Sequence, residues 1–145
     1  MRRALWLFIR VVCTAGFLSA CASLQTAETP VSTTMLTQAP AGYSVWWAEV
    51  QTCAGMPLVA LERSVISHVV VVDAPTIRYN GKDLAAFFTG EELWVAKPYL
   101  NDRAAVAHEM MHAALYMKTG HPVGHLNQYF GPGNACRLTV TYSSR

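Results

Sequence analysis

The sequence contains few charged residues, and its basic residues do not cluster. Asp, Glu, Lys and Arg make up 14% of the 145 residues, and the formal net charge is +2. Proteins that bind nucleic acids usually carry a basic patch or a basic helix, but the basic residues here are scattered apart from the pair Arg2-Arg3. We therefore expect no nucleic-acid partner.

The sequence also lacks an apolar run long enough to be a membrane-spanning helix. Such a helix needs about 20 apolar residues, and the apolar stretch of residues 4–18 is interrupted by Arg10. A basic start, this stretch and the following Leu18-Ser19-Ala20-Cys21 together form the pattern of a secretory signal. Residues 18–21 of this pattern resemble the lipobox of bacterial lipoproteins. That resemblance implies that residues 1–20 are a signal peptide and that Cys21 carries lipid.

The lipid anchor has consequences for the rest of the chain. Residues 21–42, rich in Ser, Thr, Ala and Pro, would be the lipidated Cys and a flexible tether, and residues 43–145 would be the folded domain. The membrane then becomes a partner and the cell envelope the location. Ala22 and Ser23 differ from the Asp that favours retention in the inner membrane, so a Gram-negative host would place the protein on the outer membrane, facing the periplasm. Without the signal peptide, the chain has eight Lys and Arg and nine Asp and Glu, so its formal net charge becomes −1.

Only four cysteines are present, which limits the possible disulfide pairs. Cys13 lies in the expected signal peptide, and Cys21 is the expected lipidation site. Cys53 and Cys136 remain, and in an oxidising, exported setting a leftover pair predicts a disulfide. The alternative is that Cys136 is a metal ligand.

The strongest chemical signal is the motif H-E-x-x-H, formed by His108, Glu109 and His112. Two His four residues apart lie on one face of a helix, so both imidazoles can bind one zinc ion. Glu109 lies about 100° further round the helix, where it can act as a general base on water. The alternative is a chance match on a surface helix. Residues 104–117 carry no charge outside the motif, so we expect a buried helix, in which His and Glu need partners.

The residue pattern predicts two helices and a small sheet. One helix is expected over residues 43–53, and the motif helix is expected over residues 103–118, capped by Asn101 or Asp102 and ended by Gly120. The expected strands are a buried run, its hairpin partner and a strand that precedes the motif helix: residues 65–73, 76–79 and 92–97. Two further expectations are a short helical turn over residues 83–88 and a core position for His68.

This order of elements, together with H-E-x-x-H, resembles the zincin superfamily of metallopeptidases. The resemblance is specific over residues 92–130 only. It implies an α+β fold in which a short mixed or antiparallel sheet packs against the motif helix. It also implies that residues 93–96 form the sheet edge along which an extended peptide substrate lies.

The sequence contains no acidic residue after Glu109, and this absence limits the choice of a third zinc ligand. A catalytic zinc usually has three protein ligands, but a downstream Glu or Asp, as in gluzincins, is excluded. The metzincin pattern also fails, because Leu115 and Lys118 replace its Gly and His. Small zincins of the SprT-like kind offer the nearest resemblance, which implies that His125 is the third ligand. Two alternatives remain open: His121 and Cys136.

Together, these residues and the resemblance predict a zinc-dependent peptide or protein hydrolase of the bacterial cell envelope. One zinc ion would be held by His108, His112 and His125, and Glu109 would be the catalytic base. The alternative is a non-catalytic zinc-binding lipoprotein on a degenerate zincin scaffold, which serves in envelope assembly or binding. The short chain leaves few residues to form the walls of a substrate cleft, and this favours the non-catalytic alternative. The intact Glu109 favours the enzyme.

Overall fold

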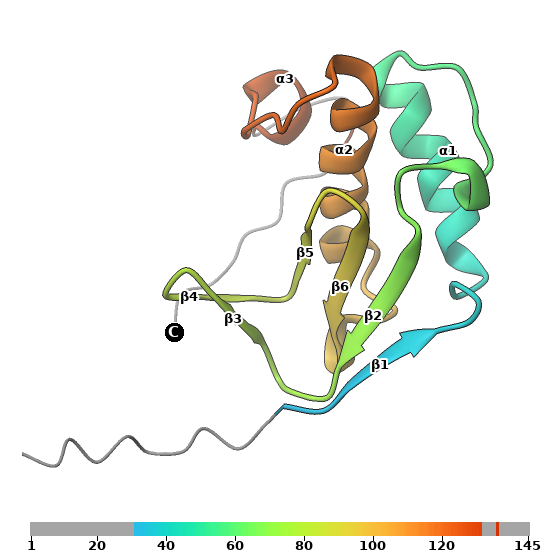
Figure 1. The fold of residues 1–145 in the computed structure, drawn as a ribbon. Helices are drawn as coiled ribbons and strands as arrows, with labels where there is room; N and C mark the ends of the chain where they lie inside the picture. Colours follow the sequence, from blue (N-terminus) through green and yellow to red (C-terminus); the bar gives the residue numbers. More distant parts are fainter. Residues whose placement is uncertain (1–30, 132–135, 137–145) are drawn as a thin grey trace, which may run out of the picture.

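The computed structural model describes residues 31–131 and Cys136, and the expected α+β class is confirmed (Figure 1). Four strands form a mixed sheet in the order β1-β2-β6-β5, and β3 and β4 form a separate hairpin. The strands are β1 Thr33–Leu36, β2 His68–Val72, β3 Ile77–Tyr79, β4 Lys82–Leu84, β5 Ala86–Phe88 and β6 Glu92–Ala96. The α-helices are α1 Gly42–Ala54, α2 Arg103–Thr119 and α3 Asn127–Phe130, and two 3-10 helices are η1 Leu61–Arg63 and η2 Lys97–Tyr99.

The helices α1 and α2 lie side by side, and α2 packs against strands β5 and β6 (Figure 1). Strand β6 is parallel to β2 and antiparallel to β5. Because side chains alternate along a strand, Leu93 and Val95 share one face of β6, and both are fully buried in the main core. Val106 and Met110 of α2 belong to the same buried cluster. This packing holds the motif helix against the β5 side of the sheet.

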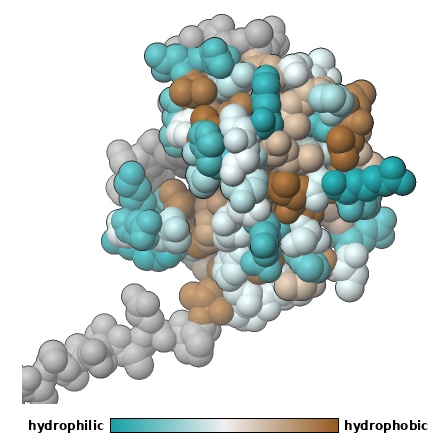
Figure 2. Space-filling view, turned by 45° about the horizontal axis from the view of Figure 1, so that its top comes forward, coloured by the Kyte–Doolittle hydropathy of each residue, from teal (hydrophilic) through white to brown (hydrophobic). Residues whose placement is uncertain are grey.

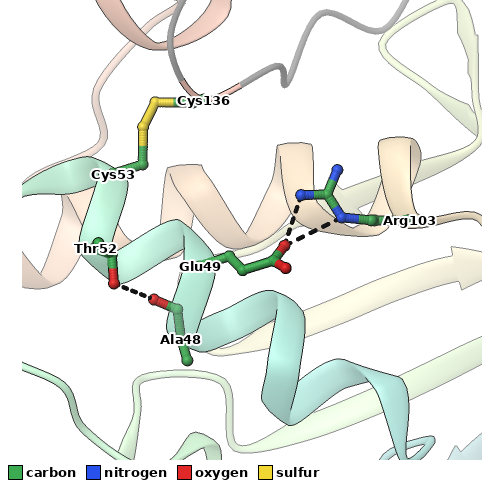
Figure 3. Close-up of polar contacts among 6 residues, drawn as sticks. All are labelled: Ala48, Glu49, Thr52, Cys53, Arg103 and Cys136. Atoms are coloured by element: carbon green, nitrogen blue, oxygen red, sulfur yellow. Dashed lines mark hydrogen bonds and ion pairs between the residues drawn. A yellow bond between two sulfur atoms is a disulfide. The ribbon is translucent and has the colours of Figure 1, made fainter.

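Two covalent or charged contacts join α1 to other parts of the fold (Figure 3). Arg103 at the start of α2 donates from Nη2 to Oε2 of Glu49 over 2.6 Å. Cys53 near the end of α1 forms a disulfide with Cys136, and their Cα atoms are 5.7 Å apart. The expected disulfide is therefore present, and Cys136 is not available as a metal ligand while it is oxidised.

Several expectations about the strands are wrong. Residues 77–79 pair with β4 and not with β2, because Asn80 and Gly81 both have positive φ, at 48° and 77°. A two-residue turn of this kind reverses the chain, so that the next strand pairs with the one directly before the turn. Residues 83–88 contribute to strands β4 and β5 rather than to a helical turn.

The two edges of the main sheet also differ from expectation. Strand β6 lies between β2 and β5, so residues 93–96 are not an edge, and β5 takes that place. At the other edge, β1 pairs with β2 although residues 33–36 fall in the expected tether. The sheet thus includes chain before Tyr43, where the domain was expected to start. His68 is exposed at the start of β2, with its Nδ1 3.0 Å from Ser67 Oγ, and is not a core residue.

The expected signal peptide, Cys21 and the first part of the tether lie outside the described residues. Within the part of the chain that is described, no helix combines the length and apolarity needed to cross a bilayer. Figure 2 shows one face on which apolar side chains form small groups between polar ones. Scattered exposure of this kind is normal on a protein surface.

Candidate metal centre

Helix α2 carries the motif and has a defined end on each side. Asp102 is the N-cap, and its Oδ1 accepts from the backbone N–H groups of Ala104 (2.8 Å) and Ala105 (3.3 Å). Gly120 ends the helix with φ of 76°, a conformation that favours glycine. The middle of the helix, residues 105–115, is buried as expected except for the half-buried His112, and His108 and Glu109 are only 6% and 8% exposed. Their side chains therefore act in surroundings with little water.

The three expected zinc ligands converge on one point. Nε2 of His125 lies 2.9 Å from Nε2 of His108 and 3.2 Å from Nε2 of His112. One ligand atom from each of the three residues lies within 4.8 Å of the others. Two nitrogens bound to one tetrahedral zinc at about 2.05 Å are roughly 3.3 Å apart. The three imidazoles are thus close enough to hold a metal ion.

The loop after α2 brings His125 to the helix and orients His112. Nδ1 of His112 lies 3.1 Å from the carbonyl oxygen of Val123. A proton on Nδ1 satisfies this carbonyl and leaves the lone pair of Nε2 directed at the other imidazoles. Burial lowers the pKa of His112, the neighbouring His125 lowers it further, and the bond to Val123 acts in the opposite direction. The neutral form, which is the form that binds metals, is therefore favoured.

The two alternatives for the third ligand are not part of this cluster of imidazoles. His121 is exposed, and its Nδ1 lies 3.3 Å from the carbonyl oxygen of Pro122. Cys136 is held by Cys53. Of the three candidates, His125 alone joins the cluster that the described residues form.

Glu109 contacts the sheet and lines a cavity together with His112. Its Oε2 accepts a hydrogen bond from the backbone N–H of Phe88, at the end of β5, over 3.1 Å. Burial raises the pKa of Glu109 to about 8, and the bond from Phe88 acts to lower it. A bound cation would favour the carboxylate. The residue can thus hold a proton or release it within the neutral range.

A cavity of about 430 Å³ opens beside Glu109 and His112. Its other walls are the end of β5, the last turns of α2 and the loop that follows α2. These walls are formed by Phe88, Thr89, Gly90, Tyr116, Gly120, His121, Pro122 and Val123. The cavity is large enough for one amino-acid side chain beside the candidate metal centre.

Two contacts at this centre were not predicted from the sequence. Phe130 of α3 is 8% exposed, and its ring centroid lies 4.7 Å from those of His108 and His112 and 4.9 Å from that of His125. Tyr129 and Phe130 follow His125 closely in the sequence, but this spacing does not indicate a contact with all three imidazoles. The hydrogen bond from Phe88 to Glu109 joins residues 21 positions apart, and no local sequence pattern predicts it.

The described residues thus bring together three imidazoles, a buried carboxyl group and a cavity. The comparisons of this chain with protein-family models, with curated proteins and with solved structures gave no match.

Proposed function

We propose that the protein is a zinc-dependent hydrolase of peptide bonds, with a zincin-like arrangement of sheet and motif helix. The observation that carries the proposal is the convergence of three Nε2 atoms beside a buried Glu that borders a cavity. Imidazole nitrogens suit zinc, and the separations of 2.9 and 3.2 Å fit one small ion. Structural zinc sites usually have four protein ligands, whereas catalytic sites have three. The set His108, His112 and His125 matches the catalytic kind.

The residues of the chain would divide the reaction between them. Zinc, when bound, supplies the Lewis acidity that polarises a carbonyl group and acidifies water near neutral pH. Glu109 accepts the proton of the attacking water and passes it to the leaving amine. Val123 keeps His112 in the ligating tautomer through its carbonyl oxygen. Phe88 fixes the carboxyl group of Glu109 through its N–H.

The cavity indicates which peptides would fit. Apart from Glu109 and the histidines, its lining side chains are uncharged, and Phe88, Tyr116 and Val123 give it apolar walls. We therefore propose that a bulky uncharged residue lies next to the bond that is cleaved. Strand β5, the edge of the sheet, takes the place of residues 93–96 as the strand along which an extended peptide would bind.

One observation favours the non-catalytic alternative. The bond from Phe88 N–H to Glu109 ties α2 to the sheet edge, and burial alone would keep Glu109 protonated. In a zinc-binding module without catalysis, Glu109 would serve only as this tie.

Glu109→Gln separates the two functions. Gln keeps an oxygen that can accept from Phe88 but cannot take a proton from water. We expect the purified wild type to hold about one zinc per chain and to cleave an unfolded protein and short peptides with a bulky apolar residue. We expect the variant to retain its zinc and to lose cleavage by roughly 10²-fold or more. Elemental analysis and peptide cleavage with and without a chelator measure both.

The exposed Glu62 provides the control, because Glu62→Gln should change neither quantity. A wild type that holds zinc but cleaves nothing would leave the binding module as the function. A wild type without zinc would end both proposals.

We also propose that the protein is anchored in the cell envelope through Cys21, which lies outside the described residues. The support is the lipobox-like run of residues 18–21. In bacteria fed labelled palmitate, the wild type should be labelled and Cys21→Ser should not. Equal labelling of both would contradict the anchor.

A further inference from the structure

Four aromatic rings at the metal centre lie at nearly equal distances. The ring centroids of His108, His112 and His125 are 5.2, 4.9 and 4.9 Å apart. The centroid of Phe130 is 4.7 to 4.9 Å from each of them. Phe130 therefore marks the fourth corner of a near-regular tetrahedron, whose base is the triangle of imidazoles.

This position decides where a metal ion could be reached. The three imidazoles would leave a tetrahedral ion one open coordination position, on the axis through the centre of their triangle. On one side of the imidazole triangle, that axis is filled by the ring of Phe130. A water molecule or substrate can therefore approach only from the other side. The cavity with Glu109 and His112 in its wall does not have Phe130 among its lining residues, as an approach from the other side requires.

We infer that Phe130 is a positioning residue of the metal centre, which holds the three imidazoles at ligating distance and leaves one coordination position open. Its ring stacks on His112 at 25° and meets His125 edge-on at 88°. These two contacts restrict rotation of a ligand on the helix and of a ligand on the loop at once. The inference rests on the metal-binding part of the proposed function and not on hydrolysis.

Gly131 explains how Phe130 reaches this position. The one-turn helix α3 closes with a hydrogen bond from Gly131 N–H to the carbonyl oxygen of Asn127, over 2.9 Å. A Cβ atom at residue 131 would lie 2.6 Å from that oxygen, closer than real contacts allow. Gly131→Ala must therefore shift the backbone next to Phe130, and it does so without altering the ring.

The test uses the full chain and measures metal binding directly. Phe130→Leu keeps an apolar side chain but removes the ring. We expect its zinc affinity, measured by competition with a chromophoric chelator, to fall about 10- to 100-fold, as for other residues that support metal ligands. With Co²⁺ in place of zinc, we expect weaker visible absorption, because additional water can reach the ion. Gly131→Ala should change both quantities in the same direction.

Leu61→Ala is the matched control. Leu61 is 5% exposed and belongs to the same core cluster, but it lies in η1, away from the imidazoles. It should lower the free energy of unfolding without changing zinc affinity or the Co²⁺ spectrum. If Phe130→Leu keeps wild-type affinity and spectrum, or if Leu61→Ala loses as much affinity, the inference is overturned while the proposed function stands. A wild type that binds neither metal would overturn both.

Discussion

At the scale of single residues, the central feature is the carboxyl group of Glu109, which is buried beside three imidazoles. Its surroundings favour the neutral acid when no metal is bound, because burial outweighs the hydrogen bond from Phe88. A cation reverses that preference. Burial thus favours the protonated carboxyl group in the metal-free protein, and a bound cation would favour the carboxylate.

The raised pKa predicts how the metal-free protein responds to pH. The pKa of Glu109 rises from 4.5 to about 8 on folding. Between these values the folded protein holds a proton that the unfolded chain has lost, so the free energy of unfolding falls as pH rises through this window. Glu109→Gln should remove this dependence on pH. Between pH 5 and pH 8, the free energy of unfolding of the variant should therefore rise by a few kcal/mol relative to that of the wild type. Urea unfolding of both proteins in chelator measures the difference.

His112 does not disturb this comparison. Its pKa is lowered, so its contribution to stability is present above pH 6.5 and is lost in acid, equally in both proteins. A difference between wild type and Glu109→Gln that stays constant from pH 5 to pH 8 would contradict the environment described for Glu109.

The place of the motif residues in the candidate site could be predicted from sequence alone, and that of the third His only in part. His108, Glu109 and His112 are local, and the helix sets their relative positions. His121 and His125 depend on the path of a loop. His121 follows the helix end at Gly120 directly, before the chain has turned back, whereas His125 comes after Val123 has reached His112. No short-range rule distinguishes these two paths.

At the scale of secondary structure, the two long helices α1 and α2 were predicted well because their ends carry local signals. Helix α2 begins after Asp102 and ends at Gly120, and α1 ends at Gly55 with φ of 65°. The three-residue strand β5 has no such signals, whereas β4 follows the turn at Asn80 and Gly81. The pairing of β5, and its place at the edge, depend on contacts with β6, a separate strand that the local pattern of residues 86–88 does not indicate.

The cap of α2 supports a prediction about this element. Asp102→Ala removes the acceptor for two backbone N–H groups and should lower the free energy of unfolding by about 1 kcal/mol. The exposed neighbour Asn101 provides the control. It is the other cap predicted from the sequence, but both hydrogen bonds go to Asp102. Chemical unfolding of Asp102→Ala and Asn101→Ala compares them. Equal effects would show that the cap does not stabilise the helix.

At the scale of the whole molecule, the disulfide joins residues far apart in the sequence. It links α1 to the chain beyond α3 and closes a separation of 83 residues (Figure 3). Bridges over such lengths stabilise chiefly by restricting the unfolded chain. The segment that carries His125 and Phe130 is therefore tied at both ends, to α2 before it and to α1 after it.

Reduction of the disulfide should lower the free energy of unfolding by about 2–5 kcal/mol. Urea unfolding with and without a thiol reductant measures this loss. The double variant Cys53→Ser with Cys136→Ser should start at the lower value and show no response to the reductant. If it responds as the wild type does, the effect of the reductant does not come from this bridge.

The candidate ligands are divided between a helix and a loop, so a bound ion would link these two elements mechanically. His108 and His112 keep their places through the packing of α2, whereas His125 lies in the loop that follows the helix. Removal of the ion would destabilise residues 120–131 first. Their amide hydrogens should then exchange faster with solvent than those of α2. The occupancy of a single cation would thus set how firmly one wall of the cavity is closed.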